Sequence, residues 1–242
     1  MKPHYGVGMD GEDLVAQGAR EEPGAGAPAR SPFHDRLPIG ERLPATALLE
    51  DPLSCFDQVV LKPLAPMLVP EQPRAGELDP SVCAHCRPSE HMIWRDDHWH
   101  LNAGFAPMGI PFVGGLAPHE HVRLEDASTE LLVTLGPLLQ RLSHAVKQVP
   151  GVARTHFSRW GDGSAHFHMW ALARPLGMMQ GRGPMLAFWD DVLPPLPQNV
   201  VERHCGIVAR AMAEGGGEVT VQEGGAVTSS AAAAPTGTPA GE

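Results

Sequence analysis

The clearest hydrophobic pattern in the chain is helical. Leucines and valines recur every three or four residues from Leu131 to Val149, which is the period of an amphipathic helix. Asp126 or Ser128 can cap this helix at its start, and a proline and a glycine directly after the pattern end it. A shorter pattern of the same kind predicts a final helix over residues 199–213.

Short apolar and aromatic runs predict strands on both sides of the long helix. Prolines cut residues 56–70 into one or two strand-like runs, residues 91–105 read as two strands around an Arg-Asp-Asp turn, and residues 110–118 form another. After the helix, residues 153–160 and 165–173 predict a hairpin whose turn is Gly-Asp-Gly-Ser. This order predicts an α+β fold around an antiparallel sheet.

Composition divides the chain into a folded part and two tails. The 27 glycines and 25 prolines are concentrated toward the ends, where apolar periodicity is almost absent. Residues 1–45 and 214–242 therefore bury too little apolar surface to offset the entropy of ordering, and we expect both to be disordered. The folded domain is then expected over residues 46–213.

Net charge narrows the choice of partners. The formal charge is −10 and no cluster of lysine and arginine occurs, which argues against an extended nucleic-acid footprint. A small phosphorylated ligand remains compatible, because one pocket can be positive in an acidic protein. No apolar run approaches the roughly 18 residues of a membrane span, and no secretory segment is apparent. The default expectation is a soluble cytoplasmic protein without membrane contact.

The sequence Cys83-Ala-His-Cys86 is the strongest signal for a metal. In a cytosolic chain this spacing favours metal binding or redox chemistry over a structural disulfide. A redox pair requires a strand before the motif and a helix opening at it, and the flanking residues predict neither. Two thiolates would fill two of the four tetrahedral positions of zinc and leave two for nitrogen. Two unconnected buried cysteines remain the alternative.

Histidines in His-x-His pairs could supply those nitrogens. The pairs are His98 with His100, His119 with His121, and His166 with His168, and on a strand such residues share one face. Downstream of the thiols the candidate ligands are His91, His119, His121, His166 and His168. Residues 119 and 121 come at the end of a predicted strand, where a loop can bend toward the thiols.

The order of these motifs resembles the histidine-triad (HIT) superfamily, including its galactose-1-phosphate uridylyltransferase branch. The resemblance covers residues 83–175: the Cys-x-x-Cys turn, an aromatic and acidic hairpin, Pro118-x-x-His121, one long helix, and a hairpin with His-Phe-His. It implies a five-stranded antiparallel sheet with the long helix packed on it, and a homodimer. It also implies a structural zinc ion held by Cys83, Cys86, His121 and His166.

The same resemblance implies the catalytic residues. His168 would be the nucleophile that attacks a phosphate and becomes nucleotidylated, and neutral imidazole suits this role because its ordinary pKa is near 6.5. The turn at Asp162, Gly163 and Ser164 would hold the phosphate through backbone amides. Arg174 directly follows the strand of the histidines and could contact a phosphate.

Trp170 departs from the family pattern. The superfamily has a third histidine at this position, and the uridylyltransferase branch has glutamine. Tryptophan offers only one indole N–H. Trp170 could stack on a base or sugar ring and so bind substrate, or it could simply cover the face of the sheet.

Three functions follow from these observations. The first is a nucleotide or sugar-nucleotide phosphohydrolase or nucleotidyltransferase that acts on a phosphate ester or anhydride through His168. The second is a zinc-bearing scaffold of the same fold that has lost turnover and binds a nucleotide or a protein partner. The third is a metal-dependent enzyme in which His-x-His pairs surround an open metal.

Overall fold

The computed structural model describes residues 34–50, 54–68, 70–87, 89–105 and 107–220. Most of the two predicted tails, residues 1–33 and 221–242, lies outside the described residues. Of residues 56–70, which were predicted to hold one or two strand-like runs cut by prolines, the described ones (56–68 and 70) form no strand. Among them, Leu64 makes an isolated parallel bridge with Ile39. The prolines remove the N–H donors that a strand would need there.

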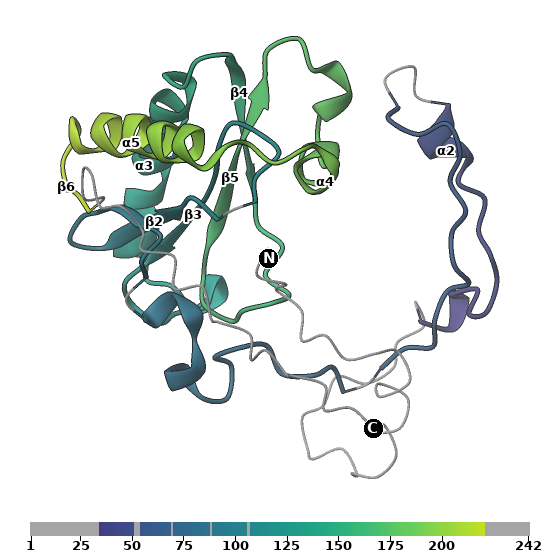
Figure 1. Cartoon of the computed structure of the whole chain (residues 1–242). Coiled ribbons are helices and arrows are strands. Elements are labelled where there is room, and N and C mark those ends of the chain that lie inside the picture. The colour runs from purple at the N-terminus through teal and green to yellow at the C-terminus, as the bar shows by residue number, and fades with distance from the viewer. Residues whose placement is uncertain (1–33, 51–53, 69, 88, 106, 221–242) are drawn as a thin grey trace, which may run out of the picture.

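An antiparallel sheet forms the centre of the fold, in the order β4-β5-β3-β2-β1-β6 (Figure 1). The predicted α+β class is confirmed, but the described sheet has six strands where five were expected. Its strands are β1 (Met92–Arg95), β2 (Trp99–Ala103), β3 (Val113–Pro118), β4 (Val152–Ser158), β5 (Met169–Pro175) and β6 (Glu218–Val219).

The sixth strand comes from the beginning of the predicted C-terminal tail. Residues 218 and 219 pair with Arg95 and Trp94 of β1, and Thr220 donates its backbone N–H to the carbonyl of Ile93. The glycine-rich composition after residue 213 gives no local sign of this pairing, because it depends on the free edge of β1. The described part of the domain therefore runs past residue 213.

Two long helices cover one face of the sheet. They are α3 (Thr129–Lys147) and α5 (Gln198–Ala213), which match the two predicted helices. Ser128 caps α3, since its side chain accepts the backbone N–H of Leu131. The indole N–H of Trp99 on β2 donates to Thr134 of α3 at 2.8 Å, which places the odd-numbered residues of β2 against the helices. None of the described helices is long and apolar enough to cross a membrane.

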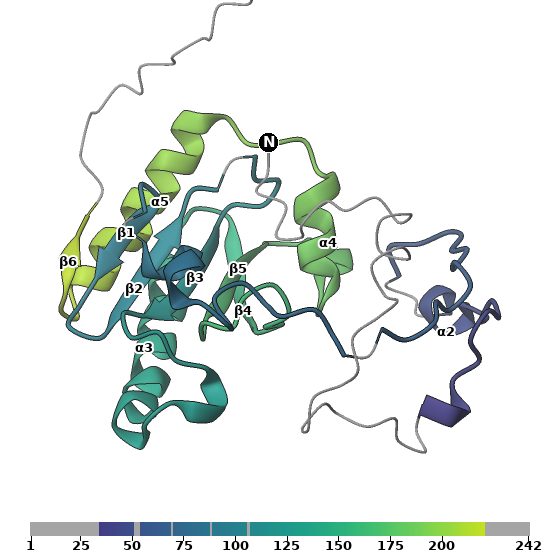
Figure 2. The same ribbon diagram turned by 90° about the horizontal axis from the view of Figure 1, so that it is seen from below.

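The opposite face of the sheet carries short 3-10 helices in place of long ones. These are η2 (Pro80–Val82) and η3 (Ala84–Cys86), which lie across β2 and β3 in Figure 2. His100 and Asn102 of β2 alternate with the core residues and so face this side. The Cys-x-x-Cys turn is thus laid over the sheet face that presents these polar side chains.

His166 and His168 precede a strand and do not lie on one. The sequence predicted a strand over residues 165–173, but β5 begins at Met169. The reason is that Ala165 donates its N–H to the carbonyl of Ala75, and Phe167 donates to Val122. The histidine segment is therefore bonded to two loops and takes no part in the hairpin ladder.

Residues 34–50 and 54–68 form an extended arm that contacts the domain beside a helix that was not among the predicted elements. This arm includes α2 (Thr46–Leu49), and the unpredicted helix is α4 (Met185–Val192) (Figure 1). The rings of Phe56 and Phe188 are 5.5 Å apart. The arm lies away from the face of the sheet that carries the candidate site.

Candidate metal centre and neighbouring pocket

Four side chains from three parts of the chain converge beneath η3. They are Cys83, Cys86, His121 and His166, and their ligand atoms all lie within 4.8 Å of one another. The Sγ of Cys86 is 3.1 Å from Nδ1 of His121 and 3.4 Å from Nδ1 of His166. The Sγ of Cys83 is 3.5 Å from Nδ1 of His166. The four predicted ligands are thus brought together.

Backbone carbonyls fix both histidine rings from behind. Nε2 of His121 donates to the carbonyl of Gly76 at 3.1 Å, and Nε2 of His166 donates to that of Pro118 at 3.0 Å. With the proton on Nε2, each Nδ1 keeps a lone pair directed at the sulfur atoms. Second partners of this kind are typical of histidines that bind a metal.

The chemistry of the four donors fits zinc. Two thiolates and two imidazoles make a closed tetrahedral set of the kind that holds structural zinc. Burial and the neighbouring Cys83 raise the pKa of the Cys86 thiol to about 11, so this thiol resists ionisation unless a cation is beside it. Zinc is therefore the metal that this group suits, and no open coordination position is left for substrate.

Gly76 permits the close approach of the metal-binding segments. Its φ is +78°, and a Cβ there would lie 2.9 Å from Cβ of Cys83 and 2.9 Å from Cε1 of His121. A side chain at this position would have to displace one of the proposed ligands.

His119 is not part of the donor group, whereas His121 is. Its side chain is exposed and its Nε2 contacts the carbonyl of Asp96 at 2.9 Å. Its ring stacks on that of His100 at 5.2 Å. Within the described residues, each His-x-His pair therefore offers at most one ligand to the metal group, which does not favour an open metal held by such pairs.

His168 is oriented by the backbone of a proposed zinc ligand. Its Nδ1 donates to the carbonyl of His166 at 2.9 Å, which leaves the lone pair on Nε2. The residue is only 7% exposed. Burial lowers the pKa of His168, and the positive charge of Arg159 lowers it as well. The imidazole is therefore neutral at pH 7, which is the state that a nucleophile requires.

His85 lies directly against His168. The two ring centroids are 4.7 Å apart with an interplanar angle of 21°. Burial lowers the pKa of His85 to about 3. No local pattern marks this residue, because its position over His168 depends on how η3 packs on the sheet.

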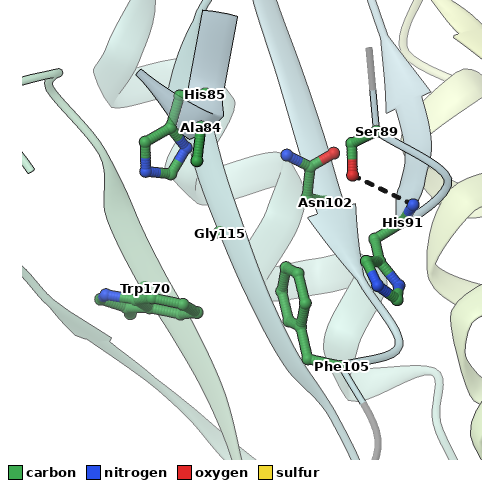
Figure 3. A pocket seen from close by; sticks show the side chains of 8 residues that line it. All are labelled: Ala84, His85, Ser89, His91, Asn102, Phe105, Gly115 and Trp170. Carbon is green, nitrogen blue, oxygen red and sulfur yellow. Dashed lines mark hydrogen bonds between the residues drawn. The ribbon is translucent and has the colours of Figure 1, made fainter. Parts of the chain in front are cut away.

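A pocket of about 190 Å³ opens beside these two rings (Figure 3). His85 and Trp170 lie on one side of it, and Asn102 and Phe105 lie on the other. The full lining is Ala84, His85, Ser89, His91, Asn102, Phe105, Gly115 and Trp170. Aromatic rings and a glycine predominate in this lining, so the pocket suits a flat, partly apolar ring.

Trp170 contributes to the pocket wall. The centroid of its indole ring lies 6.0 Å from the ring centroid of Phe105 and 5.9 Å from that of His168, and both contacts are edge-on. The sequence left two interpretations of Trp170, contact with a bound ring or simple cover of the sheet face. Its place in the pocket wall favours contact with a bound ring. Gly115 of the neighbouring strand β3 pairs with Trp170 in the sheet. Because glycine has no side chain, it leaves space for a ligand next to the indole.

The predicted phosphate-binding residues are only partly brought to His168. Asp162 and Gly163 are exposed, and Ser164 is buried with its hydroxyl 3.5 Å from the carbonyl of Ala75. Arg174 lies at the far end of β5, roughly 20 Å along the strand from His168 at about 3.3 Å per residue. Its guanidinium donates to the carbonyls of residues 175 and 178. The expectation that Arg174 contacts the substrate phosphate does not fit this position.

Arg159, and not Arg174, lies beside the segment that carries His166 and His168. It directly follows β4, its side chain is 22% exposed, and its guanidinium lies 5.9 Å from the ring of Phe167. Its Nε is buried and has no hydrogen-bond partner among the described residues, and the carboxylate of Glu125 is 3.9 Å away. Because Ser158 pairs with Trp170, the antiparallel register brings the next residue toward the histidine segment.

Comparisons with known proteins give fold-level likeness only. No family model matches the chain, and no curated protein matches it. A HIT-like protein from Bartonella henselae involved in cell-cycle regulation has 19% identity and a TM-score of 0.39, over 52% of this chain and 87% of the other. A Zn-bound histidine triad family protein from Mycobacterium smegmatis has 17% identity and a TM-score of 0.41, over 55% and 95%.

A uridylyltransferase structure is also among the matches. It has 18% identity and a TM-score of 0.37, and the match covers 55% of this chain and 45% of the other. Likeness at this level assigns neither a family nor an activity to the chain.

Proposed function

We propose that this protein transfers or hydrolyses a nucleotidyl or phosphoryl group, with His168 as the nucleophile. The observation that carries the proposal is the hydrogen bond from Nδ1 of His168 to the carbonyl of His166 at 2.9 Å. It leaves an unprotonated Nε2 on a buried, neutral imidazole beside a ring-sized pocket. The resemblance of the motif order to the HIT superfamily points to the same residue.

The proposed reaction divides one displacement into two. The lone pair of Nε2 forms a bond to the phosphorus atom while the bond from phosphorus to the leaving oxygen breaks, and its electron pair stays with that oxygen. Water or an acceptor hydroxyl then forms a P–O bond as the P–N bond breaks, and its proton passes to solvent. Positioning and charge compensation supply most of the catalysis in such transfers.

Zinc in this proposal has a structural part. Held by Cys83, Cys86, His121 and His166, it would anchor the residue whose own carbonyl orients His168. The ring of the nucleophile would then be held two residues from a rigid centre. When bound there, zinc would stabilise the fold.

Arg159 and the pocket suggest how substrate is held. The guanidinium beside the histidine segment would compensate the charge of the phosphoryl group, as arginines do at many phosphate sites. Trp170 and Phe105 would contact the base of a nucleotide, since bases stack readily on aromatic rings. The turn at Asp162 and Gly163, whose exposed backbone lies beyond Arg159, remains a proposed part of the phosphate site.

The burial of His168 beneath the ring of His85 favours a second function. The residue is 7% exposed and the ring of His85 lies on its face. A scaffold that binds a nucleotide without turnover would have the same pocket and the same zinc site. It would differ in that no covalent adduct forms.

Intact-mass spectrometry tests the two functions against each other. The zinc-loaded protein is incubated with a panel of ribonucleoside triphosphates and nucleoside diphosphate glucoses. We expect a mass increase of one nucleotidyl group that is absent in His168→Ala and retained in His119→Ala, an exposed histidine outside the donor group. Binding of a panel member without any adduct would instead establish the scaffold function.

A further inference from the structure

His85 is placed by the metal-binding turn but is not one of the donors. It lies between Cys83 and Cys86 in η3, so the two proposed ligands flank it along the chain. Its ring is stacked on His168 at 4.7 Å and is tilted against His166 at 5.3 Å. Within the described part of the chain, no hydrogen bond involves its ring nitrogens.

The ring of His85 both stacks on His168 and lines the pocket. His85 belongs to the lining of the pocket, and His168 does not. Figure 3 shows His85 on the same side as Trp170, across the open space from Phe105 and Asn102. A ligand that fills the pocket and reaches Nε2 of His168 therefore comes close to His85, whose ring nitrogens can meet it.

We propose that His85 is a substrate-contacting residue that donates a ring N–H to a phosphoryl oxygen while its ring face holds His168 in the attacking orientation. The inference rests on the proposed function, since it names a further residue of the same site. It gives the Cys-x-x-Cys turn a second task, because the turn that binds the metal also presents this imidazole to substrate.

Substitutions can separate the donor from the ring face. His85→Phe keeps an aromatic face against His168 but has no N–H, whereas His85→Gln keeps a donor without the ring. His85→Ala has neither. His144→Phe makes the same chemical change at an exposed position on α3, far from the pocket, and serves as the matched control.

The measurement is single-turnover formation of the His168 adduct, followed by mass, with the panel member that labels the wild type. We expect the maximal rate of His85→Phe to fall about 10- to 100-fold, as for the loss of a hydrogen bond to a charged group. Zinc content and melting temperature should remain at wild-type values. His85→Gln should recover most of the rate, His85→Ala should be the slowest, and His144→Phe should match the wild type.

Two results would overturn the inference while the proposed function stands. One is a wild-type maximal rate in His85→Phe, which would show that no donor is used. The other is an equally slow His85→Gln, which would tie the loss to the turn and not to the N–H. If His85→Phe loses zinc, the single-turnover rates of His85→Ala and His85→Gln are compared instead. Equal rates in these two variants would overturn the inference. A wild type that forms no adduct with any panel member removes the proposed function, and this inference falls with it.

Discussion

The Sγ atom of Cys86 lies 3.4 Å from Nδ1 of His166, although 80 residues separate the two along the chain. This contact joins the loop before the sheet to the segment that carries His168. The metal group thus closes the fold across the face where the pocket lies. Stability and the geometry of the candidate active site should therefore depend on the same ion.

Cys83→Ser should release zinc and destabilise the domain. A structural zinc site contributes several kcal/mol or more to folding, and for a domain of this size we expect the melting temperature to fall by about 10 °C or more. Metal analysis and thermal unfolding of the purified variant check this. Cys55→Ser, which lies outside the donor group, should change neither value. An unchanged melting curve with full zinc content in Cys83→Ser would remove these residues as ligands.

Gly76→Ala should weaken the metal site more than backbone strain alone can. The added Cβ meets Cys83 and His121 at 2.9 Å, and the φ of +78° adds a cost of roughly 1–2 kcal/mol. Gly177→Ala is the matched control, because its φ is +79° and no atom of the described residues lies within 4 Å of the added Cβ. We expect both variants to lose some stability but only Gly76→Ala to lose zinc in competition with a chelator. Equal zinc retention would contradict the packing argument.

Stability should fall as pH drops from about 6.5 toward 4, partly because of His100. Burial, together with the nearby His119 and His166, lowers the pKa of His100 to about 4. The unfolded chain therefore binds more protons than the folded one in this window, so the stability contributed above pH 6.5 is lost on acidification.

Urea unfolding at pH 7 and pH 5 measures this loss. His100→Gln should lose roughly 1–2 kcal/mol less than the wild type between these two values, given about 1.4 kcal/mol per pH unit for a single group. The comparison is needed because the zinc ligands also take up protons in this range. The same loss in both proteins would show that His100 contributes nothing to the pH dependence.

Arg159→Gln should slow formation of the His168 adduct, whereas Arg174→Gln should not. The first change removes the positive charge beside the histidine segment, and the second alters a side chain that bonds two carbonyls at the other end of β5. We expect a loss of about 10- to 100-fold for Arg159→Gln, in the range seen when one transition-state donor is removed. The single-turnover rates of the two variants provide the measurement, and the reverse order would mean that the register argument is wrong.

Local patterns in the sequence were sufficient for the elements with short-range causes. The helix from Thr129 to Lys147 follows from its leucine spacing and the Ser128 cap, and β1 and β2 follow from alternating aromatic residues around a turn. The thiol pair of the Cys-x-x-Cys turn is set by local geometry as well. The order of motifs then indicated His121 and His166 as partners of the thiols, through a resemblance and not through spacing.

Only the tertiary structure decided which distant side chains meet. The pairing of β6 with β1, the bonding of the histidine segment to Ala75 and Val122, and the stacking of His85 on His168 all join residues far apart in the chain. Propensity and periodicity report on a residue and its near neighbours. Contacts across the sheet depend on strand register and on the packing of loops over one face, and these are properties of the whole fold.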